Sequence, residues 1–463
     1  MKIKLTLLAL LIAIGSMAQT TTAIDGVKYT YKKEEKKLTK VTFSNGVVLD
    51  IEGSNSVSAV TLALKKYLEK AQVPPVQNTP TNPTPVPSSG TKPTFVLPSG
   101  NYTEVALISG KTLDLSGYSN QKIKLKPGNY SSIYITGNKL KNIIIDANGV
   151  NLEKSGIELG SGDFVEIYGI KMSNNNSRVL RFDFALNNFH VYNSTFINCG
   201  DYAFYCNRAK EVDYNGKVET ANIGLKIINN VFDNFGNIQM EGKLDKNLNA
   251  DKGLFKNPEV AYNTFKNSPW LGSAVVFENV ENFNFHHNIV DNVNTQNTNH
   301  NGVFFAQGSG KFHNNKLTNY QGNAIRMWLY SRGSTPYTSE IYNNICFNTS
   351  KYGAFELQGF DRYIISGKTT FANAKVYNNT VGRMNTSKDW EGQILDLYNY
   401  GGSLEFYNNL GFELNYSGRP IGNMINNMSD VVIKESGNIY KSSLNDVVDA
   451  AFNSKFTGIG ASL

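Results

Sequence analysis

A short asparagine motif recurs through most of the chain and constrains its fold more than any other feature. Each copy places Asn one position before the end of a four-residue unit that usually begins and ends with apolar or aromatic residues. The aligned asparagines lie 25 to 35 residues apart, a spacing that indicates a solenoid or a propeller. No long helical period and no Trp-Asp blade signature is present, so the repeat favours a solenoid of β-strands. The aligned residues are Asn230, Asn263, Asn288, Asn315, Asn344, Asn379, Asn409 and Asn438.

Asparagine suits a tight bend that recurs in every coil. Among residues other than glycine it tolerates left-handed backbone angles best, and stacked Asn side chains can hydrogen-bond along the axis. This pattern resembles the right-handed parallel β-helix of pectate-lyase-like proteins over roughly residues 95–450. The resemblance implies an all-β domain of about ten to twelve coils. It does not decide function, because that fold hosts lyases, hydrolases, tailspikes and adhesins.

The first 18 residues read as an export signal. Two lysines precede the apolar run Leu5–Ile14, and the small residues of Ser16–Ala18 follow it. Such a run is too short to span a bilayer, and the pattern predicts cleavage between Ala18 and Gln19. We therefore expect a secreted or periplasmic protein.

Two further segments precede the repeats. Residues 19–72 predict a small α+β accessory module with strands at Val27–Lys32, Leu38–Phe43 and Val47–Ile51, and a helix with its apolar face between residues 57 and 68. Residues 73–94 hold seven of the thirteen prolines and predict an extended linker. The β-helix domain is expected to span residues 95–463.

The charge balance argues against a nucleic-acid partner. The formal net charge is +7, but residues 1–18 contribute two lysines and residues 19–72 contribute a net +3, which leaves the large domain near neutral. The three cysteines allow at most one disulfide. We expect a monomer without a transmembrane segment.

In pectate-lyase-like proteins the first strand of each coil usually carries the site, and alternation predicts which side chains of those strands face outward. The inward positions are all apolar. The first outward column is Glu158, Arg181, Tyr205, Gln239, Val276, Phe305, Arg326, Glu356 and Asp396. The second is Gly160, Asp183, Asn207, Glu241, Glu278, Gln307, Trp328, Gln358 and Tyr398. Acids, amides and aromatic rings in such a strip are typical of glycan-binding surfaces. Insertions at 207–222, 243–257, 330–339 and 359–373 follow first strands and one at 291–302 precedes one, so we expect them to wall a groove.

The richest segment for chemistry is Asn323–Tyr330. Elimination on a uronate sugar needs a cation for the carboxylate, a base and an acid. We therefore assign Arg326 to the carboxylate and His300 or Tyr330 to the base, in a lyase acting on a uronate polysaccharide. The alternative is that Arg326 merely forms a surface ion pair with Glu356. Substrate-binding residues are predicted to be Trp328, Tyr398, Gln307, Glu356, Gln358, Asp396, Tyr205 and Arg181.

A second cluster offers oxygen ligands on successive coils. Asn207, Glu241 and Glu278 suit Ca²⁺, and Lys243 follows closely as a catalytic candidate. This is similar to the chondroitinase B and alginate lyase group, which places acids near Ca²⁺ with a Lys beside them. That group carries an Arg, followed by His and Gly, on the next turn, where this chain reads Val275–Glu278.

Two other functions stay open. Paired carboxylates at Glu241/Glu278 or Glu356/Asp396 would suit a glycoside hydrolase, although the polygalacturonase signatures are absent. A non-catalytic glycan-binding or surface-adhesion solenoid fits the same composition. We rank elimination first and hydrolysis below it.

Overall fold

The computed structural model describes two compact units, residues 1–82 and 83–463. In the first unit it describes the backbone of four strands, and in the second it describes residues 93–463 except 298, 389–390, 415–423 and 445–446.

The first unit contains an antiparallel sheet of four strands in chain order. Three of them match the predicted strands, and the first was not predicted. The predicted helix, the signal segment and residues 73–92 of the predicted linker lie outside the described residues. The strands are β1 (Gln19–Ile24), β2 (Val27–Lys32), β3 (Lys37–Thr42) and β4 (Val48–Asp50).

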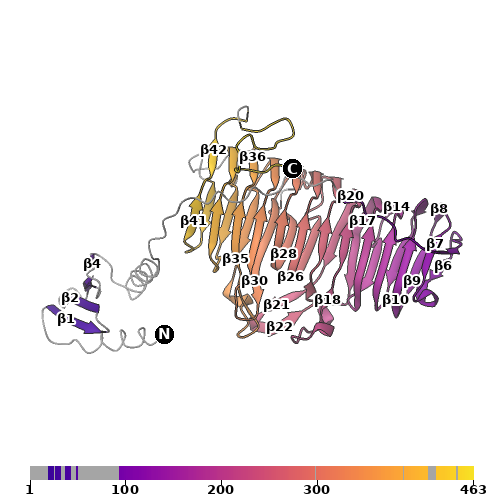
Figure 1. Cartoon of the computed structure of the whole chain (residues 1–463), viewed down its shortest axis with the longest axis horizontal. Helices are drawn as coiled ribbons and strands as arrows, with labels where there is room; N and C mark the ends of the chain where they lie inside the picture. Colours follow the sequence, from indigo (N-terminus) through magenta and orange to yellow (C-terminus); the bar gives the residue numbers. More distant parts are fainter. Residues whose placement is uncertain are drawn as a thin grey trace. The chain divides into compact units, whose positions relative to one another are not determined.

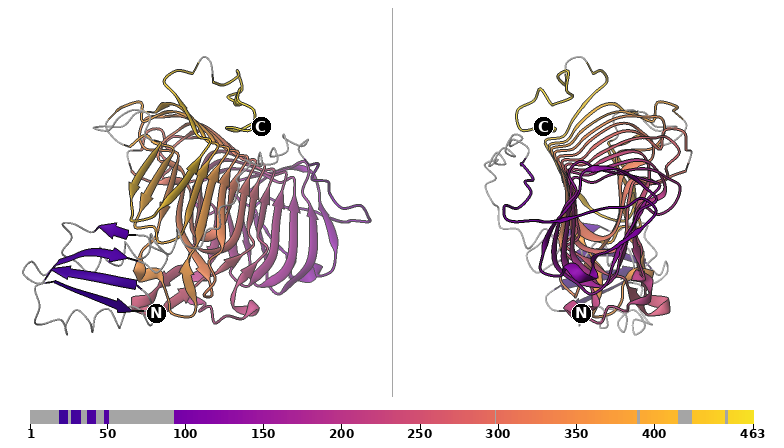
Figure 2. Two further views of the ribbon diagram at one scale, coloured as in Figure 1. Left: turned by 60° about the vertical axis from the view of Figure 1, so that its left-hand side comes forward. Right: turned by 90° about the vertical axis from the view of Figure 1, so that its right-hand side faces the viewer.

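The second unit is the predicted parallel β-helix, in which each coil contributes a strand to each of three parallel faces (Figures 1 and 2). Twelve described strands follow one another in register on the first face, within the expected ten to twelve coils. They are β6 (Thr112–Asp114), β9 (Tyr134–Gly137), β12 (Gly156–Leu159), β15 (Leu180–Asp183), the second half of β17 (Thr195–Asn207), the second half of β20 (Val231–Met240), the first half of β26 (Val275–His286), the first half of β28 (Gly302–His313), β30 (Asn323–Arg332), β33 (Phe355–Gln358), β37 (Leu395–Tyr398) and β40 (Ile425–Met428).

The second face is formed by β5 (Thr103–Val105), β7 (Lys122–Leu125), β10 (Leu140–Asp146), β13 (Gly162–Tyr168), β16 (Leu186–Tyr192), β19 (Lys226–Ile228), β24 (Glu259–Ala261), the second halves of β26 and β28, β31 (Thr338–Tyr342), β35 (Asn373–Tyr377), β38 (Leu404–Tyr407) and β41 (Ile433–Ser436). The third face is formed by β8 (Gly128–Ser131), β11 (Val150–Glu153), β14 (Lys171–Asn175), the first halves of β17 and β20, β25 (Thr264–Ser268), β27 (Ile289–Val293), β29 (Lys316–Tyr320), β32 (Ile345–Thr349), β36 (Thr380–Met384), β39 (Leu410–Leu414) and β42 (Ile439–Lys441).

Short elements lie at the corners and in the insertions. They are the strands β18 (Asn222–Ile223), β21 (Lys243–Asp245), β22 (Ala250–Lys252), β23 (Phe255–Lys256) and β34 (Thr369–Phe371), and the 3-10 helices η1 (Leu115–Tyr118), η2 (Ala209–Glu211), η3 (Val218–Thr220), η4 (Lys246–Leu248) and η5 (Asp361–Tyr363). None of the helices in the described residues is long and apolar enough to cross a membrane.

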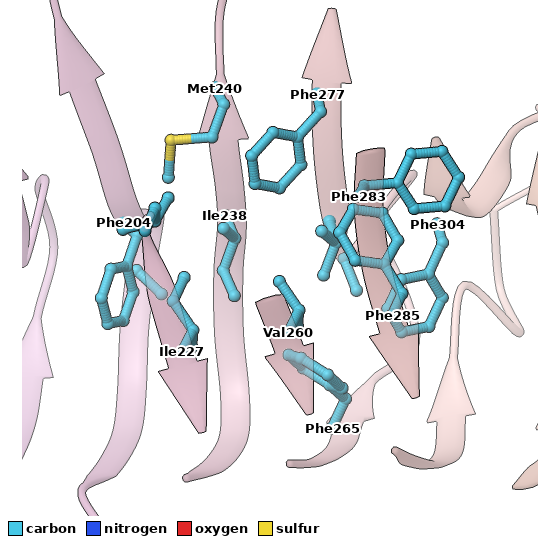
Figure 3. Packing of buried hydrophobic residues seen from close by; sticks show 14 of the residues in the cluster. Phe204, Ile227, Ile238, Met240, Val260, Phe265, Phe277, Phe283, Phe285 and Phe304 are labelled. Carbon is cyan, nitrogen blue, oxygen red and sulfur yellow. The ribbon is translucent and has the colours of Figure 1, made fainter. Parts of the chain in front are cut away.

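The core fills the inside of the coils with one layer of apolar side chains per coil (Figure 3). Ile238, Val275 and Phe304 are aligned on neighbouring coils of the first face, and all three are fully buried. The alternation of inward and outward residues read from the sequence is therefore correct along this face, because the pleat of a strand fixes it.

The asparagine ladder is present. Asn344, for example, donates from Nδ2 to Asn379 Oδ1 at 2.9 Å and accepts from the backbone N–H of Asn315 at 3.0 Å. The left-handed angle, however, belongs to the residue before each ladder asparagine, such as Asn343 with φ 51°. The ladder asparagine instead forms hydrogen bonds with backbone groups inside the bend. The residue before it takes the positive φ, and at two bends that residue is Tyr262 or His287 instead of asparagine.

Candidate functional site

The outward side chains of the first face form straight columns, as the alternation predicted. Strand register places Tyr205 beside Gln239, Phe305 beside Arg326, and Glu356 beside Asp396. Neighbouring positions in a column are roughly 4.8 Å apart, the spacing of hydrogen-bonded strands. What differs along the columns is how much of each side chain the insertions leave accessible.

Glu241 and Glu278 form an accessible carboxylate pair on adjacent coils. Their side chains are 27% and 30% exposed. The Nζ of Lys210 lies 3.6 Å from Glu241 Oε2 and 3.4 Å from Glu278 Oε2, so these two oxygens are at most the sum of those distances, about 7.0 Å, apart. We call this arrangement the Glu241–Glu278 pair.

The two carboxylates differ in the donors that surround them. Glu278 accepts hydrogen bonds from Gln239 Nε2 at 3.2 Å and from the backbone N–H of Gly242 at 3.1 Å. Glu241 accepts one from the Tyr205 hydroxyl at 3.2 Å. Glu278 is therefore fixed by more protein donors than Glu241 is.

Lys210 joins the pair from the insertion after β17, where it belongs to η2. Partial burial disfavours its charged form, but the Glu278 and Glu241 carboxylates outweigh that effect and raise the pKa of Lys210. The pair thus holds a permanent cation between its two acids at neutral pH.

The insertions that flank the pair are anchored by a buried ionic network. The Arg332 guanidinium donates to Asp251 of β22 and to Asn279 of β26, and Asn279 Nδ2 donates to Asp251 Oδ1 at 2.9 Å. Asp251 is 4% exposed and Asn279 is fully buried. Because Asn279 directly follows Glu278, this network ties the β21–β22 hairpin, labelled in Figure 1, to the strand that carries Glu278.

Tyr330, predicted to be a base, is buried. Its hydroxyl accepts from the backbone N–H of Phe360 at 2.7 Å, and its ring packs with Leu244, Tyr363 and Ile365 in a satellite core under the insertions. Burial raises the pKa of Tyr330, which further disfavours proton abstraction. Trp328, predicted to stack on sugar, contacts the same satellite core.

Arg326, predicted to bind a uronate carboxylate, donates to two acceptors of the protein. Its Nε donates to Glu356, and its Nη1 donates to the carbonyl oxygen of His300 at 2.9 Å. Glu356 is fully buried, so the pair is not the surface ion pair of the alternative interpretation either. His300 is near Arg326 as expected, but its ring stacks on Tyr352 at 3.9 Å and its Nε2 lies 2.9 Å from Glu356 Oε2.

The remaining predicted binding residues are mostly enclosed. Gln307 and Gln358 are each 6% exposed and Asp396 is 1% exposed, while Arg181 is paired with Glu158. Tyr398 keeps partial exposure at the end of β37. The expected continuous groove is therefore open at the Glu241–Glu278 pair and closed over β33 and β37, so Glu356/Asp396 cannot serve as a substrate-facing acid pair.

The predicted Ca²⁺ ligands do not fit a resident metal well. Lys210 already supplies a cation to Glu241 and Glu278, and an ammonium at that position repels a second cation. Among the described residues there is no group of three or more His, Cys, Asp or Glu side chains that could hold a metal ion. Asn207 is half-buried beside Asp183 of the preceding coil, and Lys243 is exposed on the β21–β22 hairpin. Calcium binding stays a prediction that only a metal titration can test.

Sequence reasoning missed Lys210 and Arg332. Both lie in or beside insertions, where no periodicity tells which way a side chain points. The insertions themselves were found from coil lengths, and the structure places η2, η3, the β21–β22 hairpin, η5 and β34 within them.

Comparisons with known proteins give fold-level similarity only. No family model matches the chain, and no curated protein matches it. One similar solved structure is the catalytic unit of a thermostable GH87 α-1,3-glucanase from Streptomyces thermodiastaticus strain HF3-3, at 11% identity and a TM-score of 0.36, covering 73% of this chain and 60% of that chain. Another is the catalytic domain of a GH87 α-1,3-glucanase in complex with tetrasaccharides, at 13% identity and a TM-score of 0.36, covering 74% and 70%.

The expectation of a uronate lyase is corrected. Both similar structures are hydrolases, and neither is a pectate lyase or a member of the chondroitinase B and alginate lyase group. Within this chain, Arg326 is bound to Glu356 and the Tyr330 side chain is buried. The alternative of paired carboxylates accounts better for the one accessible cluster described above.

Proposed function

We propose that the β-helix hydrolyses a polysaccharide with the Glu241–Glu278 pair as its two catalytic carboxylates. The observation that carries the proposal is an accessible pair of acids on adjacent coils, held by one lysine and flanked by anchored insertions. Outside this pair, the other predicted acid pair of the first face is buried.

The spacing of the pair is compatible with glycoside hydrolysis. Retaining enzymes hold their carboxyl groups about 5–5.5 Å apart, and inverting enzymes hold them about 6.5–9.5 Å apart. An upper limit of about 7.0 Å between the two Oε2 atoms admits both mechanisms. The stereochemistry of the released sugar would distinguish them.

The hydrogen-bond donors around the two carboxylates suggest which of them acts as the acid and which as the nucleophile or base. Glu278, whose oxygens accept from Gln239 and Gly242, is held in a fixed position to act as nucleophile or as base for a water molecule. Glu241 would protonate the glycosidic oxygen, so that the leaving sugar departs as an alcohol while the C–O bond breaks. Lys210 aligns both side chains in the free protein and would withdraw as a sugar enters between them.

The substrate belongs outside the cytoplasm if the first 18 residues direct export, as their sequence suggests. The two carboxylates of the pair favour a neutral glycan over a polyuronate.

The test is release of reducing ends from a panel of purified neutral polysaccharides, including α-1,3-glucan, starch, dextran and xylan. We expect Glu241→Gln and Glu278→Gln each to lower the rate by about 10²–10⁴-fold, the usual contribution of a positioned acid or base. Glu405→Gln is a matched control, since Glu405 is also an outward glutamate paired with a lysine, Lys375, on another face. Equal rates in all three variants would refute the assignment. Binding without any release of reducing ends would favour the glycan-binding alternative.

A further inference from the structure

A second concave site lies at the carboxyl ends of β33, β37 and β40. Its cavity has a volume of about 620 Å³ and shares no residue with the Glu241–Glu278 pair. Four strand-to-strand steps on the first face separate β26, which carries Glu278, from β37. At about 4.8 Å for each step, the site lies roughly 19 Å from the Glu241–Glu278 pair along the axis of the coils. We call it the distal cleft. Its lining residues are Gly359, Phe360, Asp361, Asn399, Tyr400, Asn427, Met428, Ser429 and Asp430.

The floor of the distal cleft is held rigidly by hydrogen bonds. The backbone N–H of Tyr400 donates to Ser429 Oγ at 2.9 Å, and the backbone N–H of Ser429 donates to Asn427 Oδ1 at 2.9 Å. The Tyr400 hydroxyl donates to the carbonyl oxygen of Ala372 at 2.7 Å, and its ring is 3% exposed. The cleft is therefore formed before any ligand arrives, which lowers the entropic cost of binding.

Several polar groups at the rim of the distal cleft take no part in this hydrogen-bond network. Asp361 and Asp430 are exposed, and within the described residues neither carboxylate has a hydrogen bond or an ion pair. The amide of Asn399 likewise makes no hydrogen bond to a described residue. Beside them, Met428 is 56% exposed, so an apolar side chain adjoins the acceptors. The half-buried ring of Phe360 packs with the Arg362 guanidinium, 5.1 Å from its centroid.

This combination matches the chemistry of a neutral sugar. Carboxylate and amide groups accept hydrogen bonds from hydroxyls, and apolar side chains pack against the C–H face of a pyranose ring. Two carboxylates against the single guanidinium of Arg362 leave a net negative rim, which favours neutral sugars over uronate or sulfate groups. A volume of about 620 Å³ is within the range of about 300–1,000 Å³ that is usual for small-ligand sites.

We propose that the distal cleft binds a neutral glycan segment of the same polymer that the Glu241–Glu278 pair cleaves. The identity of that polymer as a substrate rests on the proposed function, whereas glycan binding at the cleft does not. A site roughly 19 Å from the point of cleavage would retain a long chain and leave short oligosaccharides unaffected.

Affinity electrophoresis in gels containing starch, dextran, xylan, α-1,3-glucan, alginate or pectate tests the proposal. We expect the parent protein to be retarded by at least one neutral polysaccharide and by neither acidic one. The variant Asp361→Asn/Asp430→Asn should bind that polysaccharide about tenfold more weakly, because hydrogen bonds to charged groups are the stronger ones. Met428→Ala should weaken binding as well, and Glu435→Gln, an exposed acid on β41 outside the cleft, should not.

The outcomes separate this proposal from the preceding one. A Glu241→Gln/Glu278→Gln variant that releases no sugar but is retarded like the parent supports the cleft as a separate binding site. Retardation that depends on Asp361 and Asp430 in a parent protein without hydrolytic activity would support the cleft and refute the proposed function. Unchanged retardation of the cleft variant, tighter binding of alginate than of neutral glycans, or stoichiometric Ca²⁺ binding lost with the two acids would overturn the cleft proposal.

Discussion

The ion pair between Arg326 and Glu356 is expected to stabilise the fold rather than to act on a substrate. Glu356 is fully buried and the Arg326 side chain is 22% exposed. In Arg326→Met the carboxylate would lose its cationic partner, while His300 and Gln358 would remain beside it. Removing one partner of a buried pair costs about 3–5 kcal/mol, and the remaining neighbours put our expectation near the lower end of that range.

Urea denaturation measures this free energy of unfolding directly. Arg181→Met is the matched control, because Arg181 lies in the same column and its partner Glu158 is 46% exposed, so we expect a loss of at most about 1 kcal/mol. Adding Glu356→Gln to Arg326→Met should cost less than the sum of the two single changes, since no uncompensated charge then remains.

The opposite results would refute this reasoning. If Arg326→Met lowers the free energy of unfolding by less than about 1 kcal/mol, the pair behaves as an exposed one despite its burial. If the variant unfolds like the parent but loses sugar release, Arg326 acts on the substrate after all.

Two further predictions concern the bends of the coil. Asn344→Ala removes the bonds to Phe312, Asn315 and Asn379 and should lower the free energy of unfolding by about 2–4 kcal/mol, whereas Asn151→Ala removes one exposed bond and should cost under about 1 kcal/mol; equal midpoints in urea would contradict the ladder argument. Burial and the neighbouring His286 lower the pKa of His287 to about 4. As pH falls, His287 therefore binds a proton in the unfolded chain before it does so in the folded chain. The free energy of unfolding should decrease from about pH 6.5 to about pH 4, by up to ~1.4 kcal/mol per pH unit, and His287 should not affect it above that window. In His287→Asn, which introduces the residue type found at this bend in other coils, the free energy of unfolding measured in urea should differ less between pH 7.5 and pH 4.5 than in the parent protein. An equal difference in the two proteins would contradict the assignment to His287.

The regular part of the coil could be predicted because its geometry is local. A strand alternates its side chains with a period of two, so Ile325 and Met327 had to face inward once Arg326 faced outward. The bend repeats because one asparagine satisfies backbone groups of two coils. That logic identified Asn288 as a ladder residue, although it assigned the left-handed angle to the wrong neighbour, which is His287.

Burial of Glu356 could not be predicted in this way. Its cover comes from the irregular segments that lead into β28 and β33, where Tyr352 stacks on His300 and a Cβ on Gly353 would lie 3.0 Å from Asp396 Oδ2. Neither segment carries a periodic signal. The contact between Lys210 and the Glu241–Glu278 pair is of the same kind, because η2 lies in an insertion and reaches forward to the next two coils.

The two acid pairs of the first face show how the insertions control the chemistry of the fold. Glu241/Glu278 and Glu356/Asp396 are equivalent by sequence, since each consists of outward carboxylates on adjacent coils. At β33 and β37 the covering segments exclude solvent, and Glu356 is neutralised by Arg326 as part of the structure. At β20 and β26 the hairpin is held to one side by Arg332, and the acids stay accessible to a ligand. An insertion that moved over Glu278 would turn the proposed site into a second buried ion pair without altering a single residue of the coil.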